Sequence, residues 1–169
     1  MTNIENVKEA IMTAIEMEKD GYSFYKKAAD QTNSDMGRTI FESLAEDEQM
    51  HLDVFQKMFE ETVGSEEWKD LLISSKKYEK ISVFPNDLKD IEGDNPNTSE
   101  LDAIRIAMDS EKEAIDYYNK IKNKLTDTEI IKIIDEIIAQ EKNHFSLLEG
   151  EFNHIATTGY WFEFDYLGN

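Results

Sequence analysis

The chain has 169 residues, 40% of them hydrophobic, and its 37 acidic and 18 basic side chains give a net charge of −19. Such a surface repels nucleic acids and anionic membranes, and no apolar run approaches the roughly 18 residues of a membrane span. With an N-terminus too polar for a signal peptide, we expect a cytoplasmic protein that binds neither nucleic acid nor membrane. The absence of cysteine excludes disulfides, iron–sulfur clusters and thiolate zinc sites, so any metal must be bound by oxygen and nitrogen.

Apolar residues recur at helical spacing in four segments, and the seven glycines and two prolines rarely interrupt them. The pattern predicts four long helices, at residues 4–32, 35–62, 99–124 and 127–155. A break at Asn33-Ser34-Asp35 separates the first two helices. We expect Thr98 or Ser99 to cap the third helix. Thr126 or Asp127 is expected to cap the fourth.

The connections predict how the helices are arranged. Short turns make antiparallel hairpins of residues 4–62 and 99–155, whereas the polar segment 63–98 is long enough to cross over between them. Ser65–Ser74 is expected to form a short helix within this crossover. The aromatic tail, 157–169, is expected to pack on the bundle as a strap rather than to dock a partner. The sequence thus predicts an all-α, four-helix bundle built as a single domain from two repeated hairpins.

Polar residues interrupt each apolar stripe at positions where the helical period calls for hydrophobic side chains. There are six of them: Glu18, Glu48, His51, Glu111, Glu141 and His144. Burying such groups costs several kcal/mol each unless they are paired or bind a metal. The stripes contain no lysine or arginine that could pair with them, which favours a metal site over a core of ion pairs.

The six residues form a repeat, which a chance pattern would not. The offset between related residues is 93 throughout: Glu18 to Glu111, Glu48 to Glu141 and His51 to His144. A third Glu-x-x-His pair, Glu151 and His154, has no such counterpart, because the same offset leads to Met58 and Glu61. We therefore interpret His154 as a chance match and the other six residues as parts of a duplicated helical hairpin.

The placement of the six residues predicts what they bind. They lie near the midpoints of their helices, which share one level in an antiparallel bundle, and Glu and His at i and i+3 lie on one face. Four carboxylates and two neutral imidazoles carry a charge of −4, which two divalent cations would cancel. Mixed oxygen and nitrogen ligands with open positions suit iron, or manganese, better than a closed zinc site.

Four segments resemble the helices of rubrerythrins, members of the ferritin-like diiron-carboxylate proteins: EKDGYSFYKKAA, FESLAEDEQMHLDVF, SEKEAIDYY and IIAQEKNHFSLL. The resemblance implies that the six residues bind two iron ions, with Glu48 and Glu141 bridging or chelating. It also implies reduction of hydrogen peroxide with electrons from a rubredoxin-like donor. Because this chain lacks the four cysteines of a rubredoxin site, the donor must be a separate protein. Rubrerythrins also have a further Glu where this chain has Ala114, which bears on how efficiently peroxide would react.

Two tyrosines complete the predicted site. Tyr25 and Tyr118 each follow a predicted ligand Glu by seven residues, and we interpret them as hydrogen-bond donors to ligand carboxylates. Our leading hypothesis is a homodimeric, rubrerythrin-like peroxidase. The alternatives are a ferroxidase or iron-storage protein resembling bacterioferritin, which has the same six ligands, and a helical scaffold with a structural metal.

Overall fold

The computed structural model describes residues 3–64 and 96–162. They form α1 (Asn3–Gln31), α2 (Asp35–Val63), α4 (Pro96–Lys122) and α5 (Thr128–Thr158). Within these ranges there is no strand, and no helix has an apolar stretch long enough to cross a membrane. The predicted all-α bundle is confirmed. Some predictions lie outside the described residues, namely those for the helix at Ser65–Ser74, the crossover over 65–95 and the tail over 163–169.

The start of α4 differs from the prediction. The helix begins at Pro96 rather than at residue 99, so the expectation that Thr98 or Ser99 caps it is wrong. Proline is favoured at the first helical position because its ring fixes φ near the helical value and its missing N–H would have no helical partner there. The helix therefore includes both residues that were expected to precede it.

Side-chain caps begin the second helix of each hairpin. Ser34, within the predicted break, caps α2, and Asp127, one of the two predicted candidates, caps α5 by accepting two backbone N–H groups at 2.9 and 3.2 Å. α5 runs to Thr158, past its predicted end at residue 155. It stops where Gly159 takes a left-handed φ of 81°, a conformation that glycine adopts without steric cost.

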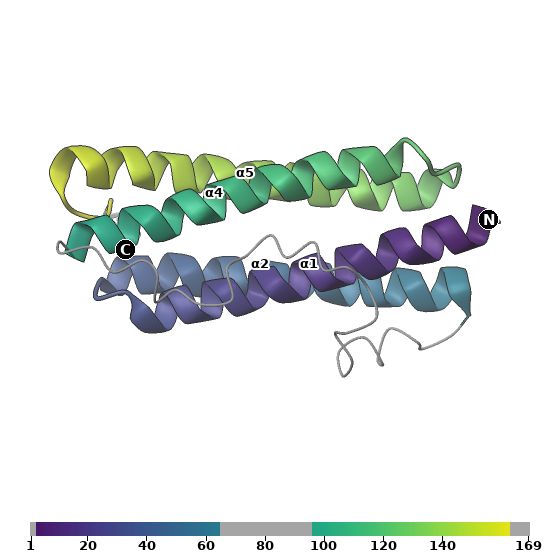
Figure 1. Ribbon diagram of the computed structural model, residues 1–169, viewed down its shortest axis with the longest axis horizontal. Helices are drawn as coiled ribbons and strands as arrows, with labels where there is room; N and C mark the ends of the chain where they lie inside the picture. The colour runs from purple at the N-terminus through teal and green to yellow at the C-terminus, as the bar shows by residue number, and fades with distance from the viewer. Residues whose placement is uncertain (1–2, 65–95, 163–169) are drawn as a thin grey trace, which may run out of the picture.

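The two hairpins lie side by side along their whole length (Figure 1). α1 and α2 run antiparallel, as do α4 and α5, whereas α2 and α4 run in the same direction. The end of α2 and the start of α4 consequently lie at opposite ends of the bundle (Figure 1). This up-down-down-up order brings the midpoints of all four helices to one level.

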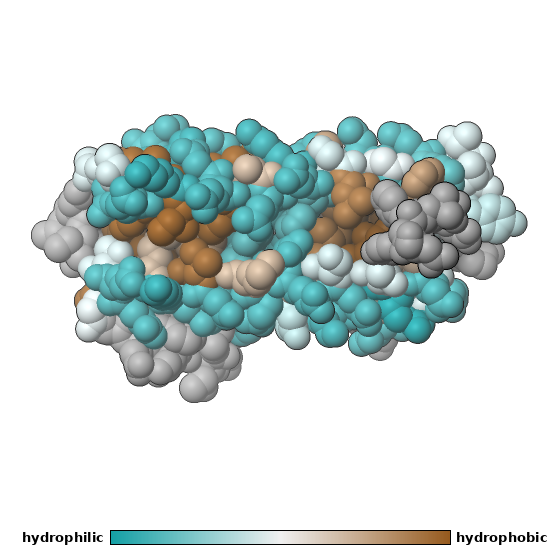
Figure 2. Space-filling model, turned by 180° about the vertical axis from the view of Figure 1, so that it is seen from behind, coloured by the Kyte–Doolittle hydropathy of each residue, from teal (hydrophilic) through white to brown (hydrophobic). Residues whose placement is uncertain are grey.

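The apolar core is divided into two clusters, one towards each end of the bundle. The large buried residues of the first include Tyr25, Phe41, Ile104, Leu148 and Trp161. Those of the second are Ile15, Phe55, Phe59, Tyr118 and Ile134. Figure 2 shows the molecule from behind, with α2 and α5 towards the viewer. On this face the same division appears as two apolar areas separated by hydrophilic residues. The six polar residues singled out above lie between the clusters.

Trp161 connects the two hairpins beyond the end of α5. Its ring is buried against the edge of Phe41, with centroids 5.5 Å apart, and its Nε1 donates to Glu100 at 2.9 Å. The other Glu100 oxygen accepts from Thr32 at 2.6 Å. A Cβ at Gly37 would lie 2.7 Å from the indole, so this close packing requires glycine. At this tryptophan the aromatic tail packs on the bundle as predicted.

Candidate metal centre

The structure brings all six predicted residues into one buried cluster. None is more than 5% exposed: Glu18, Glu48, His51, Glu111, Glu141 and His144. They form two groups of four whose donor atoms lie within 4.8 Å of one another. One group contains Glu18 and His51, the other contains Glu111 and His144, and Glu48 and Glu141 belong to both. Glu48 and Glu141, the shared pair, are the two residues predicted to bridge or chelate the metal ions.

Both histidines point the same ring nitrogen into this cluster. Nδ1 of His51 lies 3.3 Å from Glu18 Oε2 and 3.2 Å from Glu141 Oε1. Nδ1 of His144 lies 3.0 Å from Glu141 Oε2 and 3.5 Å from Glu48 Oε1. The two rings are stacked, with centroids 5.8 Å apart. Each imidazole therefore presents Nδ1 to its own group of carboxylates and turns Nε2 outward.

The outward nitrogens contact two residues that the sequence analysis did not identify. Nε2 of His144 lies 3.1 Å from Asp47 Oδ2, and Nε2 of His51 lies 3.0 Å from Gln140 Oε1. Each partner immediately precedes the Glu of the opposite hairpin's Glu-x-x-His pair. Positions 47 and 140 are themselves 93 residues apart, so the repeat could have revealed them.

The two tyrosines make hydrogen bonds across the bundle. Tyr25 donates to Glu111 and Tyr118 donates to Glu18, so each reaches the carboxylate of the other hairpin. Seven residues place a tyrosine about 10.5 Å along the axis from the Glu of its own helix, too far for a direct contact. Burial raises the pKa of both phenols, and the neighbouring carboxylates raise it further. Both hydroxyls therefore keep the proton that they donate.

In the metal-free protein, protons compensate for the crowded carboxylates. Burial raises the pKa of Glu111 to about 8, and burial together with neighbouring carboxylates raises that of Glu48 well above its ordinary value. Burial alone would lower the pKa of His51, but its carboxylate contacts, that with Glu141 foremost, outweigh burial and raise it to about 11. The pKa of His144 is raised for the same reason. The two imidazoles in turn hold the pKa of Glu141 near 2 against the effect of burial.

Several inward-facing atoms lie close to one another but make no hydrogen bond of good geometry. They are fully buried and comprise Glu18 Oε2, Glu48 Oε1, His51 Nδ1 and Glu141 Oε1. Such atoms are costly to bury unless a cation or a donor meets them. All four belong to the group around His51, and their carboxylate and imidazole chemistry is that of iron and manganese ligands. The residues present therefore fit a pair of divalent cations.

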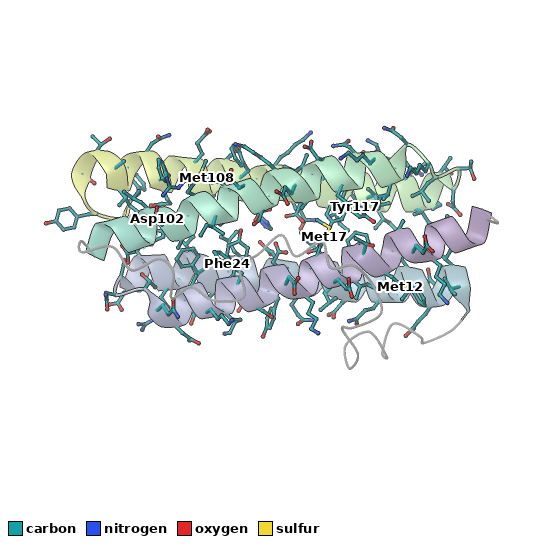
Figure 3. The ribbon with its side chains drawn as sticks, in the orientation of Figure 1. Met12, Met17, Phe24, Asp102, Met108 and Tyr117 are labelled. Atoms are coloured by element: carbon teal, nitrogen blue, oxygen red, sulfur yellow. The ribbon has the colours of Figure 1, made fainter. Side chains whose placement is uncertain are left out.

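Small residues stand one turn after Glu18 and Glu111, the two terminal carboxylates, each of which belongs to only one of the two groups. A Cβ at Gly21 would lie 2.5 Å from Glu48 Oε2, so glycine here leaves the space that this carboxylate occupies. The related position on α4 is Ala114, which lines a cavity of about 10 Å³, room for about one water molecule. Met17 also lines this cavity, and Figure 3 shows it near the middle of the bundle, facing the other hairpin.

His154 lies away from the cluster. Neither group of possible ligands contains it, among the residues that the structure describes. Its ring packs edge-on against Phe162, with centroids 5.1 Å apart, and Glu151 accepts the backbone N–H of Phe162 at 3.0 Å. This third Glu-x-x-His pair thus holds the chain that follows α5.

Comparisons with known proteins agree with this geometry. The family model of rubrerythrin matches residues 9–151. A proposed ferritin-like diiron-carboxylate protein from Thermotoga maritima is 26% identical, with a TM-score of 0.64, over 87% of this chain and 94% of that one. A hypothetical protein from Pyrococcus furiosus is 20% identical, with a TM-score of 0.69, over 88% and 89% of the two chains. No curated protein sequence matches the chain. The predicted ferritin-like fold is confirmed.

Proposed function

The chain belongs to the rubrerythrin family, and from that premise we propose that it is a diiron oxidoreductase that reduces hydrogen peroxide to water. Each turnover would consume one peroxide, two electrons and two protons and would yield two water molecules. Because the chain contains no cysteine, it has no rubredoxin-type iron site of its own. The electrons would come from a separate, rubredoxin-like donor.

The observation that carries this proposal is the pair of overlapping ligand groups. Glu18 and Glu111 would each hold one ion, and Glu48 and Glu141 would contact both. Two ferrous ions held in this way would supply the two electrons that reduction of one O–O bond requires. The four carboxylates match the charge of two divalent cations and would go on holding the pair when its charge rises.

The protein supplies the surroundings of the reaction. Tyr25 and Tyr118 fix the terminal carboxylates by hydrogen bonds, and the two apolar clusters exclude water from either side of the site. The small cavity beside Ala114 has room for about one water molecule. A cavity of this size would favour a small oxidant such as hydrogen peroxide over a bulky one.

Reaction with two oxidants tests the proposal. The protein would be loaded anaerobically with two ferrous ions per chain and mixed separately with hydrogen peroxide and with dioxygen. We expect faster oxidation by peroxide, and repeated turnover with a reductant while two irons remain bound. The His154→Ala variant is the matched control, because this histidine lies outside both ligand groups, and it should react as the unmodified protein does.

Other outcomes would contradict the proposal. Uptake of many ferrous ions per chain with formation of a ferric mineral would indicate an iron-storage protein, which requires a closed cage of many chains. Sizing the oligomer gives an independent answer, since the homodimer that we propose has no internal cavity for mineral. Equally slow reaction with both oxidants would refute peroxidase activity and leave only the metal site.

A further inference from the structure

We propose that Asp47 and Gln140 make the two metal positions unequal, so that the position held by His144 binds a divalent cation more tightly than the position held by His51. The inference rests on the metal centre of the proposed function and goes beyond its reaction. Asp47 and Gln140 act as positioning residues, because they contact the outer nitrogens of the imidazoles rather than the ions.

The geometry of the two outer contacts is nearly the same. Asp47 on α2 reaches His144 on α5 at 3.1 Å, and Gln140 on α5 reaches His51 on α2 at 3.0 Å. Both contacts involve Nε2, both cross from one hairpin to the other, and both partners precede a shared Glu by one residue. Distance and position therefore do not distinguish the two imidazoles.

The chemistry of the two contacts differs. A cation on Nδ1 leaves the ring proton on Nε2, which must then donate outward. The His144 ring donates to a carboxylate, whereas the His51 ring donates to the neutral amide oxygen of Gln140. A charged acceptor draws the Nε2 proton more strongly, which makes Nδ1 a better electron donor to a metal.

The remaining ligands of the two positions are equal in kind. Each group has one terminal glutamate, one imidazole and the same two shared carboxylates. Each terminal glutamate accepts a hydrogen bond from one tyrosine of the opposite hairpin. The difference between a carboxylate and an amide behind the imidazoles is therefore the main difference in charge between the two positions.

The test measures how a single ion distributes between the two positions. Metal-free protein with ¹⁵N-labelled histidine would receive one equivalent of Co²⁺, whose paramagnetism shifts the exchangeable Nε2 proton of whichever imidazole holds it. Asp47→Asn assigns the two signals, because it changes the hydrogen bond of His144 alone. Loss of an outer hydrogen-bond partner typically changes metal affinity about 10-fold or more. We accordingly expect about a 10:1 preference for the His144 position in the unmodified protein.

Exchanging the two partners makes the test specific. In Asp47→Asn both imidazoles face amides, and in Gln140→Glu both face carboxylates, so the ratio should approach 1:1 in each. The double variant, Asp47→Asn with Gln140→Glu, should reverse the preference. Glu46→Gln removes a neighbouring negative charge without an assigned contact to either imidazole and should leave the ratio unchanged.

Two results would overturn the inference: equal occupancy in the unmodified protein, or a double variant that keeps the original preference. A merely structural role for Asp47 and Gln140 would alter stability but would not reverse the order. The measurement uses Co²⁺ and no oxidant, so its result is separate from that for peroxide turnover. A protein that reverses the preference but does not reduce peroxide supports this inference and refutes the proposed activity.

Discussion

Loading the metal-free protein with two divalent cations at pH 7 should release about three protons per chain or more. Three buried groups, Glu111, His51 and His144, carry a proton at this pH in the absence of metal. Glu111, whose pKa is about 8, is a neutral carboxylic acid, and burial together with neighbouring carboxylates shifts the pKa of Glu48 in the same direction. His51, with a pKa of about 11, and His144, whose pKa is raised as well, are imidazolium ions. A metal ion requires each of them deprotonated, because a ligand atom cannot hold a proton and a cation together.

The release can be measured directly. Anaerobic titration with Co²⁺ or Fe²⁺ in a weakly buffered solution with a pH indicator counts the protons per ion. Calorimetric titrations in buffers of different ionisation enthalpy give the same number independently. Proton release should stop once two ions per chain have bound.

The number of protons released distinguishes binding at the buried centre from adventitious binding at the surface. The chain has 37 acidic residues, and exposed carboxylates are already ionised at pH 7, so cations that bind among them would release almost no protons. Glu111→Gln should lower the release by about one proton, since it removes one protonated ligand, whereas His154→Ala should leave it unchanged. A release of one proton or fewer would refute either the ligand set or the protonation states.

Two further predictions concern the same residues. The melting temperature of the metal-free protein should fall as pH rises from about 5 towards 8. Because its pKa is raised, Glu111 binds more protons in the folded protein than in the unfolded chain. Stability therefore declines as pH rises through the folded-state pKa of about 8. Glu111→Gln should flatten this dependence in a thermal scan, and an unchanged slope would contradict the argument. Gly21→Ala should weaken metal binding about 10-fold by displacing Glu48 Oε2, which lies 2.5 Å from the new Cβ. The same substitution should not lower the stability of the metal-free helix, because alanine favours helix over glycine by about 1 kcal/mol, and Ala114→Gly is the matched control that should leave metal affinity unchanged.

The sequence was sufficient to predict the bundle and the convergence of the six polar residues. Glutamate at position 18 and histidine at position 51 stand where an apolar side chain is expected, and the helical period alone places them in the core. Their repetition at a constant offset then predicts two similar hairpins. Antiparallel hairpins of equal length bring their midpoints to one level, which is how the structure assembles the cluster.

The helical period and the repeat could not predict the contacts between the two hairpins. Tyr25 was correctly expected to donate to a carboxylate, but the helical period cannot tell which hairpin provides the acceptor. Asp47 looked like one more surface acid in an acidic chain, and only the three-dimensional packing shows its contact with His144. The start of α4 was predicted wrongly because Thr98 and Ser99 are good caps in isolation, whereas Pro96 starts the helix earlier.

The duplicated hairpin explains both the symmetry of the centre and the places where the symmetry is broken. Two equal halves would give two equal metal positions, yet a two-electron reaction at a pair of metals does not require equality. The six proposed ligands are the same in both halves, whereas the residues behind them differ, with Asp47 opposite Gln140 and Gly21 opposite Ala114. Changes behind the ligands alter affinity by small factors without removing a ligand. The two halves can therefore differ in the residues behind the proposed ligands while the buried carboxylates, whose charge two divalent ions would balance, stay the same.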